Sequence, residues 1–169
     1  MDHTTDSVTG TLESLMRKIP GFGGYLDRER RRDADKLQRE FMARGLSELK
    51  RKVQDAQEEL INAGNMKMMT KLDDVNNIVD RVAGRLRHAN YGFAGLFEQN
   101  QVNEEELNRI YEFDLSLVNE LSHSEEALQA LVANLETENI KARVSDLEKS
   151  IRAIDSKLDE RERLLKGVR

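Results

Sequence analysis

The residues that come closest to a reactive site lie in the segment Glu120-Leu121-Ser122-His123. In a helix this spacing sets a carboxylate and an imidazole one turn apart, as in the Glu-x-x-His motif of di-iron four-helix bundles. Such a site needs a second Glu-x-x-His and two further glutamates, whereas the chain has 3 histidines and a single copy of the motif. A helical-bundle metal-binding protein is therefore our third hypothesis, and we predict no metal ligand and no cofactor.

Other catalytic chemistry lacks a motif. The absence of Cys excludes disulfides, cysteine-ligated zinc and thiol nucleophiles. The glycine-containing residues 19–25 have no third glycine at Leu26 for a dinucleotide fingerprint and no Gly-Lys-Ser or Gly-Lys-Thr for a phosphate loop. Serine-hydrolase and metalloprotease patterns are also missing. We therefore predict that the protein is not an enzyme.

Positive charge gathers in one part of a chain that is acidic overall. Residues 28–52 hold 10 Lys or Arg and 5 Asp or Glu, whereas residues 53–169 hold 15 basic and 23 acidic residues. One interpretation is internal, with a basic helix packed against acidic ones. The other is a face for anionic lipid or an acidic partner. The net charge of −5 and the lack of interleaved aromatic residues argue against nucleic acid.

The segment before the basic residues is apolar on one side. Thr11 suits the N-cap of a short helix that ends before Pro20. We predict that this segment and the densest basic cluster together contact a partner or a membrane, through Leu12, Leu15, Met16, Ile19, Phe22, Tyr25, Arg28, Arg30, Arg31 and Arg32. The alternative is that Phe22 and Tyr25 plug the end of a helical bundle.

An amphipathic start, a basic first long helix and an acidic remainder resemble, in arrangement, bacterial membrane-remodelling proteins of the phage-shock type and ESCRT-III-like helical hairpins. The resemblance covers the order of segments and no diagnostic motif. It implies a peripheral protein whose N-terminal helix and arginines meet an anionic membrane surface. This membrane-binding protein is our alternative function.

The spacing of apolar residues predicts an all-α fold. We expect a disordered tail at residues 1–10, a short helix at 11–19 and long helices at 27–63, 66–99 and 103–137. Gly64 is expected to end the first long helix in a left-handed conformation. Because short connections favour antiparallel neighbours, residues 11–139 are predicted to form an antiparallel bundle domain.

A further repeat predicts a coiled-coil segment over residues 140–169. Its seam consists of Ile140, Val144, Leu147, Ile151, Ile154, Leu158 and Leu165. The stripe is too narrow to be stable alone, so it must pack on the bundle or on a second copy. We favour self-association. The seam changes phase at residues 137–139, where neither Gly nor Pro marks a turn, so we expect a continuous or gently bent helix there.

One charged residue falls on the apolar seam of the helix predicted at residues 103–137. That seam consists of Leu107, Ile110, Leu117, Leu121, Leu128, Leu131 and Leu135. Asp114 lies between Ile110 and Leu117, at a position where apolar residues are expected. A carboxylate at such a position costs stability unless it is paired. We expect either a solvated edge position or a pair with an arginine of the bundle, such as Arg81 or Arg85.

These features together predict a non-catalytic helical scaffold or adaptor that associates with itself or with another helical protein. No run of about 20 apolar residues is present to span a membrane. Residues 1–10 lack the basic and apolar regions of a signal peptide. We therefore expect a cytoplasmic protein.

Overall fold

The described part of the chain consists mainly of α-helices. The computed structural model describes residues 3–24, 28–88 and 104–167, with side chains for residues 9–24, 33–88 and 105–164. Its helices are α1 (His3–Lys18), α2 (Arg28–Asn62), α3 (Met69–His88), α5 (Glu104–Val132) and α6 (Ile140–Gly167). The described ranges contain no strand, which confirms the predicted all-α fold.

The helices begin and end close to several predicted positions and differ at others. The predicted helices at 27–63 and 103–137 correspond to α2 and α5. The helix predicted at 66–99 corresponds to α3, which ends at His88, and residues 89–103 lie outside the described part. Since α1 begins at His3, residues 3–10 are helical where we expected disorder.

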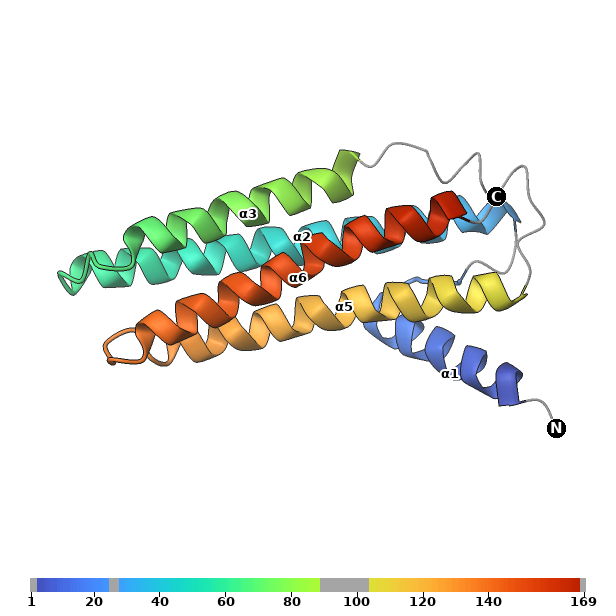
Figure 1. The fold of residues 1–169 in the computed structure, drawn as a ribbon, viewed down its shortest axis with the longest axis horizontal. Coiled ribbons are helices and arrows are strands. Elements are labelled where there is room, and N and C mark those ends of the chain that lie inside the picture. Colours follow the sequence, from blue (N-terminus) through green and yellow to red (C-terminus); the bar gives the residue numbers. More distant parts are fainter. Residues whose placement is uncertain (1–2, 25–27, 89–103, 168–169) are drawn as a thin grey trace.

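The helices α2 and α3 form one helical hairpin (Figure 1). Near its turn, Asn76 Nδ2 donates a hydrogen bond to Gln57 Oε1 at 2.9 Å. Far from the turn, Arg39 Nη1 donates to the Leu86 carbonyl at 3.1 Å. Residues later in α3 therefore contact residues earlier in α2, because the chain turns back on itself.

The helices α5 and α6 form a second hairpin. Lys157 Nζ lies 3.4 Å from Ser116 Oγ, and Arg161 Nε lies 2.6 Å from Asp114 Oδ1, so the partners again run in opposite order. The two hairpins pack together through α2 against α5 and α3 against α6, while α1 packs on α5 (Figure 1). The bundle is thus an assembly of two locally closed units.

The turn of the first hairpin has the predicted glycine cap. Gly64 has a φ of 71°, in the left-handed region. Its N–H donates to the Ile61 carbonyl at 3.0 Å, and the N–H of Asn65 donates to the Leu60 carbonyl at 2.8 Å. This pair of hydrogen bonds defines a Schellman motif, which satisfies the last carbonyl groups of α2.

The turn of the second hairpin shows that the predicted continuous helix is wrong. α5 ends at Val132 and α6 begins at Ile140. Thr137 Oγ1 accepts a hydrogen bond from the Asn139 N–H at 3.3 Å, as the side chain of a Ser/Thr turn does. At the other end, Asn134 Nδ2 donates to the Ala130 carbonyl at 2.7 Å. Polar side chains thus stabilise this turn without glycine or proline.

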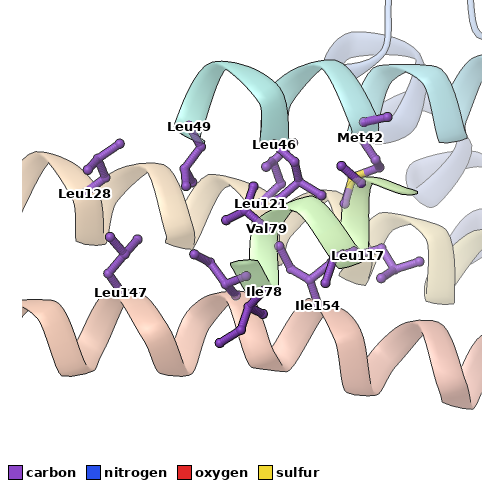
Figure 2. Packing of buried hydrophobic residues seen from close by; sticks show 14 of the residues in the cluster. Met42, Leu46, Leu49, Ile78, Val79, Leu117, Leu121, Leu128, Leu147 and Ile154 are labelled. Carbon is purple, nitrogen blue, oxygen red and sulfur yellow. The ribbon is translucent and has the colours of Figure 1, made fainter. Parts of the chain in front are cut away.

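The core lies where the two hairpins meet. Figure 2 shows side chains from all four long helices turned toward one another, among them Met42, Leu46, Leu49, Ile78, Val79, Leu117, Leu121, Leu128, Leu147 and Ile154. On α2 the buried face includes Ala34, Leu49, Val53, Ala56 and Leu60. Phe41 and Leu37 are only partly buried, whereas Met42 and Gln38 are at most 1% exposed.

Two helical glycines allow a paired test of this packing. A Cβ on Gly45 would lie 2.5 Å from Leu121 Cδ2, whereas a Cβ on Gly84 would meet nothing within 4 Å. Replacing helical Gly with Ala gains about 1 kcal/mol of helix propensity, but overpacking a core costs about 1–3 kcal/mol. We expect Gly84→Ala to raise the free energy of unfolding and Gly45→Ala to lower it in urea denaturation. A gain for Gly45→Ala would contradict the close approach of α2 and α5.

Candidate functional site

Polar side chains lie inside the bundle where α2, α5 and α6 meet. They are Asp35 and Gln38 of α2, Asp114 of α5 and Arg161 of α6, each at most 5% exposed. We call these four residues the buried polar cluster. Because charged residues are almost never buried to this degree unless they are paired, their partners decide what the cluster does.

Arg161 joins the members of the cluster. Its Nε donates to Asp114 Oδ1 at 2.6 Å and its Nη2 to Asp114 Oδ2 at 3.3 Å, which is a bidentate arrangement. Its Nη2 also donates to Asp35 Oδ1 at 3.2 Å. Gln38 Nε2 donates to Asp114 Oδ1 at 3.3 Å, and Arg39 Nε donates to Asp35 Oδ2 at 2.9 Å. The cluster therefore ties α2 and α5 to the C-terminal part of α6.

Asp114 does pair with an arginine, but it is not at a solvated edge position, since it is 0% exposed, and its partner is neither of the two arginines named as examples. Arg81 and Arg85 both bind Asp155 of α6. Asp114 binds Arg161, which occupies the seam position of α6 between Leu158 and Leu165. Each of the two seams thus carries one charged residue, and the two charges have opposite sign. We missed that complementarity in the sequence.

The buried polar cluster joins helices and leaves little room for a ligand. Both of its carboxylates accept hydrogen bonds from arginine. A cavity beside it, lined by Gln38, Arg39 and Arg161 among others, has a volume of about 40 Å³. Ligand pockets are roughly ten times larger, so this space does not admit a metabolite.

A second group of charges fixes α3 to α6 nearer the surface. Arg85 donates to Asp155 at 2.5 Å, to Asp159 at 2.7 Å and to Glu162 at 3.1 Å. Burial raises the pKa of Asp155, but hydrogen bonds from Arg81 and Arg85 outweigh that effect and hold the pKa below its ordinary value. The stabilising contribution of such a carboxylate is present above its unfolded pKa and is lost as the pH falls through its folded pKa.

The apolar residues predicted for partner or membrane contact lie mainly inside the bundle. Leu15 and Ile19 are 0% exposed and Phe22 is 2% exposed, and all three belong to the core. Leu12 packs against that core and is partly buried. Met16 is 50% exposed. The segment thus presents one half-exposed apolar side chain among those described.

The remaining residues of that predicted contact surface are Tyr25, Arg28, Arg30, Arg31 and Arg32. Tyr25 lies outside the described residues, and so do the side chains of the four arginines, whose backbone forms the first turns of α2. Further along α2, Lys50 Nζ lies 2.5 Å from Asp80 Oδ2 of α3. This ion pair agrees with the interpretation that the basic helix packs against acidic helices of the same chain.

The seam predicted for self-association is buried within a single chain. Val144, Leu147, Ile151 and Ile154 are 0% exposed, and Ile140 and Leu158 are 8% exposed. Leu165 lies in the last turn of α6, and its side chain is not among those described. Because α6 packs on α5 and α3, a second copy would have to displace one of these helices to reach the seam. Self-association through these residues stays a prediction.

The Glu-x-x-His motif lies on the outer side of α5. His123 is 61% exposed at its side chain, and its Nδ1 lies 3.6 Å from Glu120 Oε2. The other oxygen of Glu120 lies 3.8 Å from Lys157 Nζ. Among the side chains that the structure describes, no group of three or more His, Asp or Glu is placed to hold a metal ion.

A groove runs between α2 and α5 toward the two hairpin turns. One hollow of about 460 Å³ is lined by Glu48, Leu49, Lys52, Asp55, Ala56, Glu59, Glu125, Leu128, Gln129, Val132 and Ala133. A second hollow of about 340 Å³ shares Glu59, Val132 and Ala133 and is completed by Leu60, Ala63, Leu135, Glu136 and Thr137. We call the two hollows together the α2–α5 groove.

Apolar side chains are exposed at this end of the molecule. Val132 lines both hollows and is 44% exposed. Ile61 and Met66, beside the first hairpin turn, are 50% and 59% exposed. The sequence did not point to this surface, because its residues come from two helices that are far apart along the chain.

Neither a search for membrane-spanning helices nor a comparison with known proteins indicates a function. Within the described ranges, no helix is both long enough and apolar enough to cross a membrane. No protein-family model, no curated protein and no solved structure matches the chain.

Proposed function

We propose that the protein is a non-catalytic helical adaptor that holds a partner protein in the α2–α5 groove. The observation that carries this proposal is the hollow of about 460 Å³ between two packed helices, continued by a second of about 340 Å³. An amphipathic helix commonly binds by laying its apolar face into a groove of this kind. The walls belong to two hairpins, so the groove is preformed.

The composition of the groove supports the same function. Its floor is formed by Leu49, Ala56, Leu60 and Leu128, which are at most 2% exposed. Val132 stands at its side with 44% of its surface exposed. Exposed apolar side chains rimmed by polar residues are typical of protein interaction sites.

The alternative function, binding to an anionic membrane through the N-terminal segment, has less support. A helix that lies on a membrane needs an exposed apolar face. In α1 and the residues after it, Leu15, Ile19 and Phe22 are committed to the core. Met16 is the half-exposed apolar residue that remains on the described part of this segment. We therefore favour the adaptor.

Site-specific photo-crosslinking tests the adaptor function. We expect p-benzoylphenylalanine in place of Val132 to give an adduct of discrete mass in the cells that naturally express the protein, because position 132 faces the groove. The matched control places the same residue at Arg152, whose side chain is 55% exposed on α6. The proposal is rejected if the adducts formed at position 132 are the same as those formed at position 152, or if position 132 forms none. The groove would then hold no partner.

A further inference from the structure

We infer that the partner segment is a basic amphipathic helix from a different protein, with an apolar stripe flanked by Lys or Arg. This inference rests on the proposed function of the α2–α5 groove and adds the chemistry of its occupant. Three features of the groove lead to it: its length, the charge of its rim and the burial of the basic helices that this chain itself contains.

The length of the groove fits a short helix. Its wall on α2 extends from Glu48 to Ala63. At about 1.5 Å per residue this wall is about 22 Å long, which is the length of about four helical turns. Two hollows along it would receive apolar side chains of the partner spaced one or two turns apart, as in other helix-in-groove complexes.

The rim of the groove is acidic. Its carboxylates belong to Glu48, Asp55, Glu59, Glu125 and Glu136, and its cation to Lys52. Arg51, which does not line the groove, pairs with Glu48 at 2.7 Å and with Asp55 at 3.0 Å. These two carboxylates are therefore partly neutralised.

The other rim carboxylates carry the attraction. Glu59, Glu125 and Glu136 are exposed and form no ion pair with any other side chain that the structure describes. Complementary charge around an apolar contact steers association and selects the partner. Lys or Arg beside the apolar stripe of a bound helix would meet these three carboxylates.

A second copy of this chain does not supply such a helix. Its most basic helices are α2, with 10 basic and 8 acidic residues, and α6, with 8 basic and 6 acidic residues. The apolar residues Leu49 and Val53 of α2 and Ile151 of α6 are at most 1% exposed within the bundle. A second copy would have to detach α2 or α6 from its own bundle before offering such a face. The occupant is therefore a helix of another protein.

Two synthetic peptides of about 18 residues, or five turns, test the inference. Both place Leu at the same helical positions, and the remaining positions are Lys in one peptide and Glu in the other. We expect the Lys peptide to bind the full chain at least about tenfold more tightly than the Glu peptide in fluorescence anisotropy at physiological ionic strength. Val132→Asp should weaken binding of the Lys peptide, because it replaces an exposed apolar side chain of the groove with a charged one.

A pair of charge variants separates the groove from the overall charge. Glu59→Lys, Glu125→Lys and Glu136→Lys together should weaken binding of the Lys peptide by at least about tenfold. The control combines Glu105→Lys, Glu112→Lys and Glu160→Lys, which changes the net charge equally at exposed positions away from the groove. This control should bind within about twofold of the wild type.

Three results would overturn the inference. Equal losses in the two triple variants would show that the net charge attracts the peptide. Equal binding of the Lys and Glu peptides would show that the groove selects no charge, and a crosslinked adduct at position 132 would then still support the adaptor. A wild-type dimer in sedimentation that Val132→Asp dissociates would show that a second copy fills the groove.

Discussion

Replacing Arg161 with Met is expected to lower the free energy of unfolding by about 3–5 kcal/mol. The substitution removes the guanidinium that pairs with Asp114 and Asp35. These two residues are 0% and 4% exposed. Asp114 then keeps Gln38 as a hydrogen-bond donor but loses its opposite charge. Urea denaturation followed by circular dichroism measures the change.

Arg152→Met is the matched control. Arg152 lies on the same helix, pairs with Glu148 and is 55% exposed, so its loss should cost no more than about 1 kcal/mol. Adding Asp114→Leu to Arg161→Met should recover most of the lost stability, because it removes the uncompensated carboxylate. Equal losses in the two single variants would show that Arg161 does not neutralise buried charge.

Replacing Ile151 with Ala is expected to lower the free energy of unfolding by about 2–5 kcal/mol. Ile151 is 0% exposed on the seam of α6 and belongs to the core of the single chain. Since the side chain packs within one chain, the midpoint of urea denaturation should not depend on protein concentration. Denaturation at several concentrations measures both quantities.

Ile61→Ala makes the same chemical change at a residue that is 50% exposed. It should change stability by no more than about 0.5 kcal/mol. A midpoint for the wild type that rises with protein concentration, together with a loss of that rise in Ile151→Ala, would mean that the seam of α6 pairs two copies. The self-association that we predicted from the sequence would then hold.

Helical periodicity and a glycine cap were enough to predict most of the fold. The charged and apolar residues alternate with the period of a helix, and this pattern placed α2 and α5 within a few residues of their ends. Gly64 ends α2 because a left-handed φ of 71° suits a residue without Cβ. Both signals are local, so they can be read without knowing the tertiary structure.

The second hairpin turn could not be predicted from glycine or proline. Its backbone groups are satisfied by side chains, with Thr137 Oγ1 as the acceptor near the start of α6 and Asn134 Nδ2 as a donor near the end of α5. Thr137 was the available signal, since a Thr hydroxyl can close a turn by accepting a hydrogen bond from the backbone N–H two residues on. The phase change at residues 137–139 therefore marks a reversal of the chain, which we interpreted as a change of partner along one helix.

That error explains why the partner of Asp114 was missed. A continuous helix would carry residues 140–165 away from the bundle, so Arg161 was not considered as a partner. Once the chain reverses, the seam of α6 runs back along α5 and brings Arg161 to Asp114 at 2.6 Å. The α2–α5 groove was missed for a related reason, because it exists only where two hairpins pack and no single segment encodes it.

The order in which the bundle folds depends on how far apart its contacts lie along the chain. Each hairpin closes across a short turn, so its contacts form early and at little entropic cost. The hydrogen bond from Arg161 to Asp35 joins residues 126 positions apart, and it requires both hairpins to be in place. Contacts that form after the transition state slow unfolding and leave the folding rate nearly unchanged. We therefore expect the buried polar cluster to lengthen the lifetime of the assembled bundle more than it speeds the assembly.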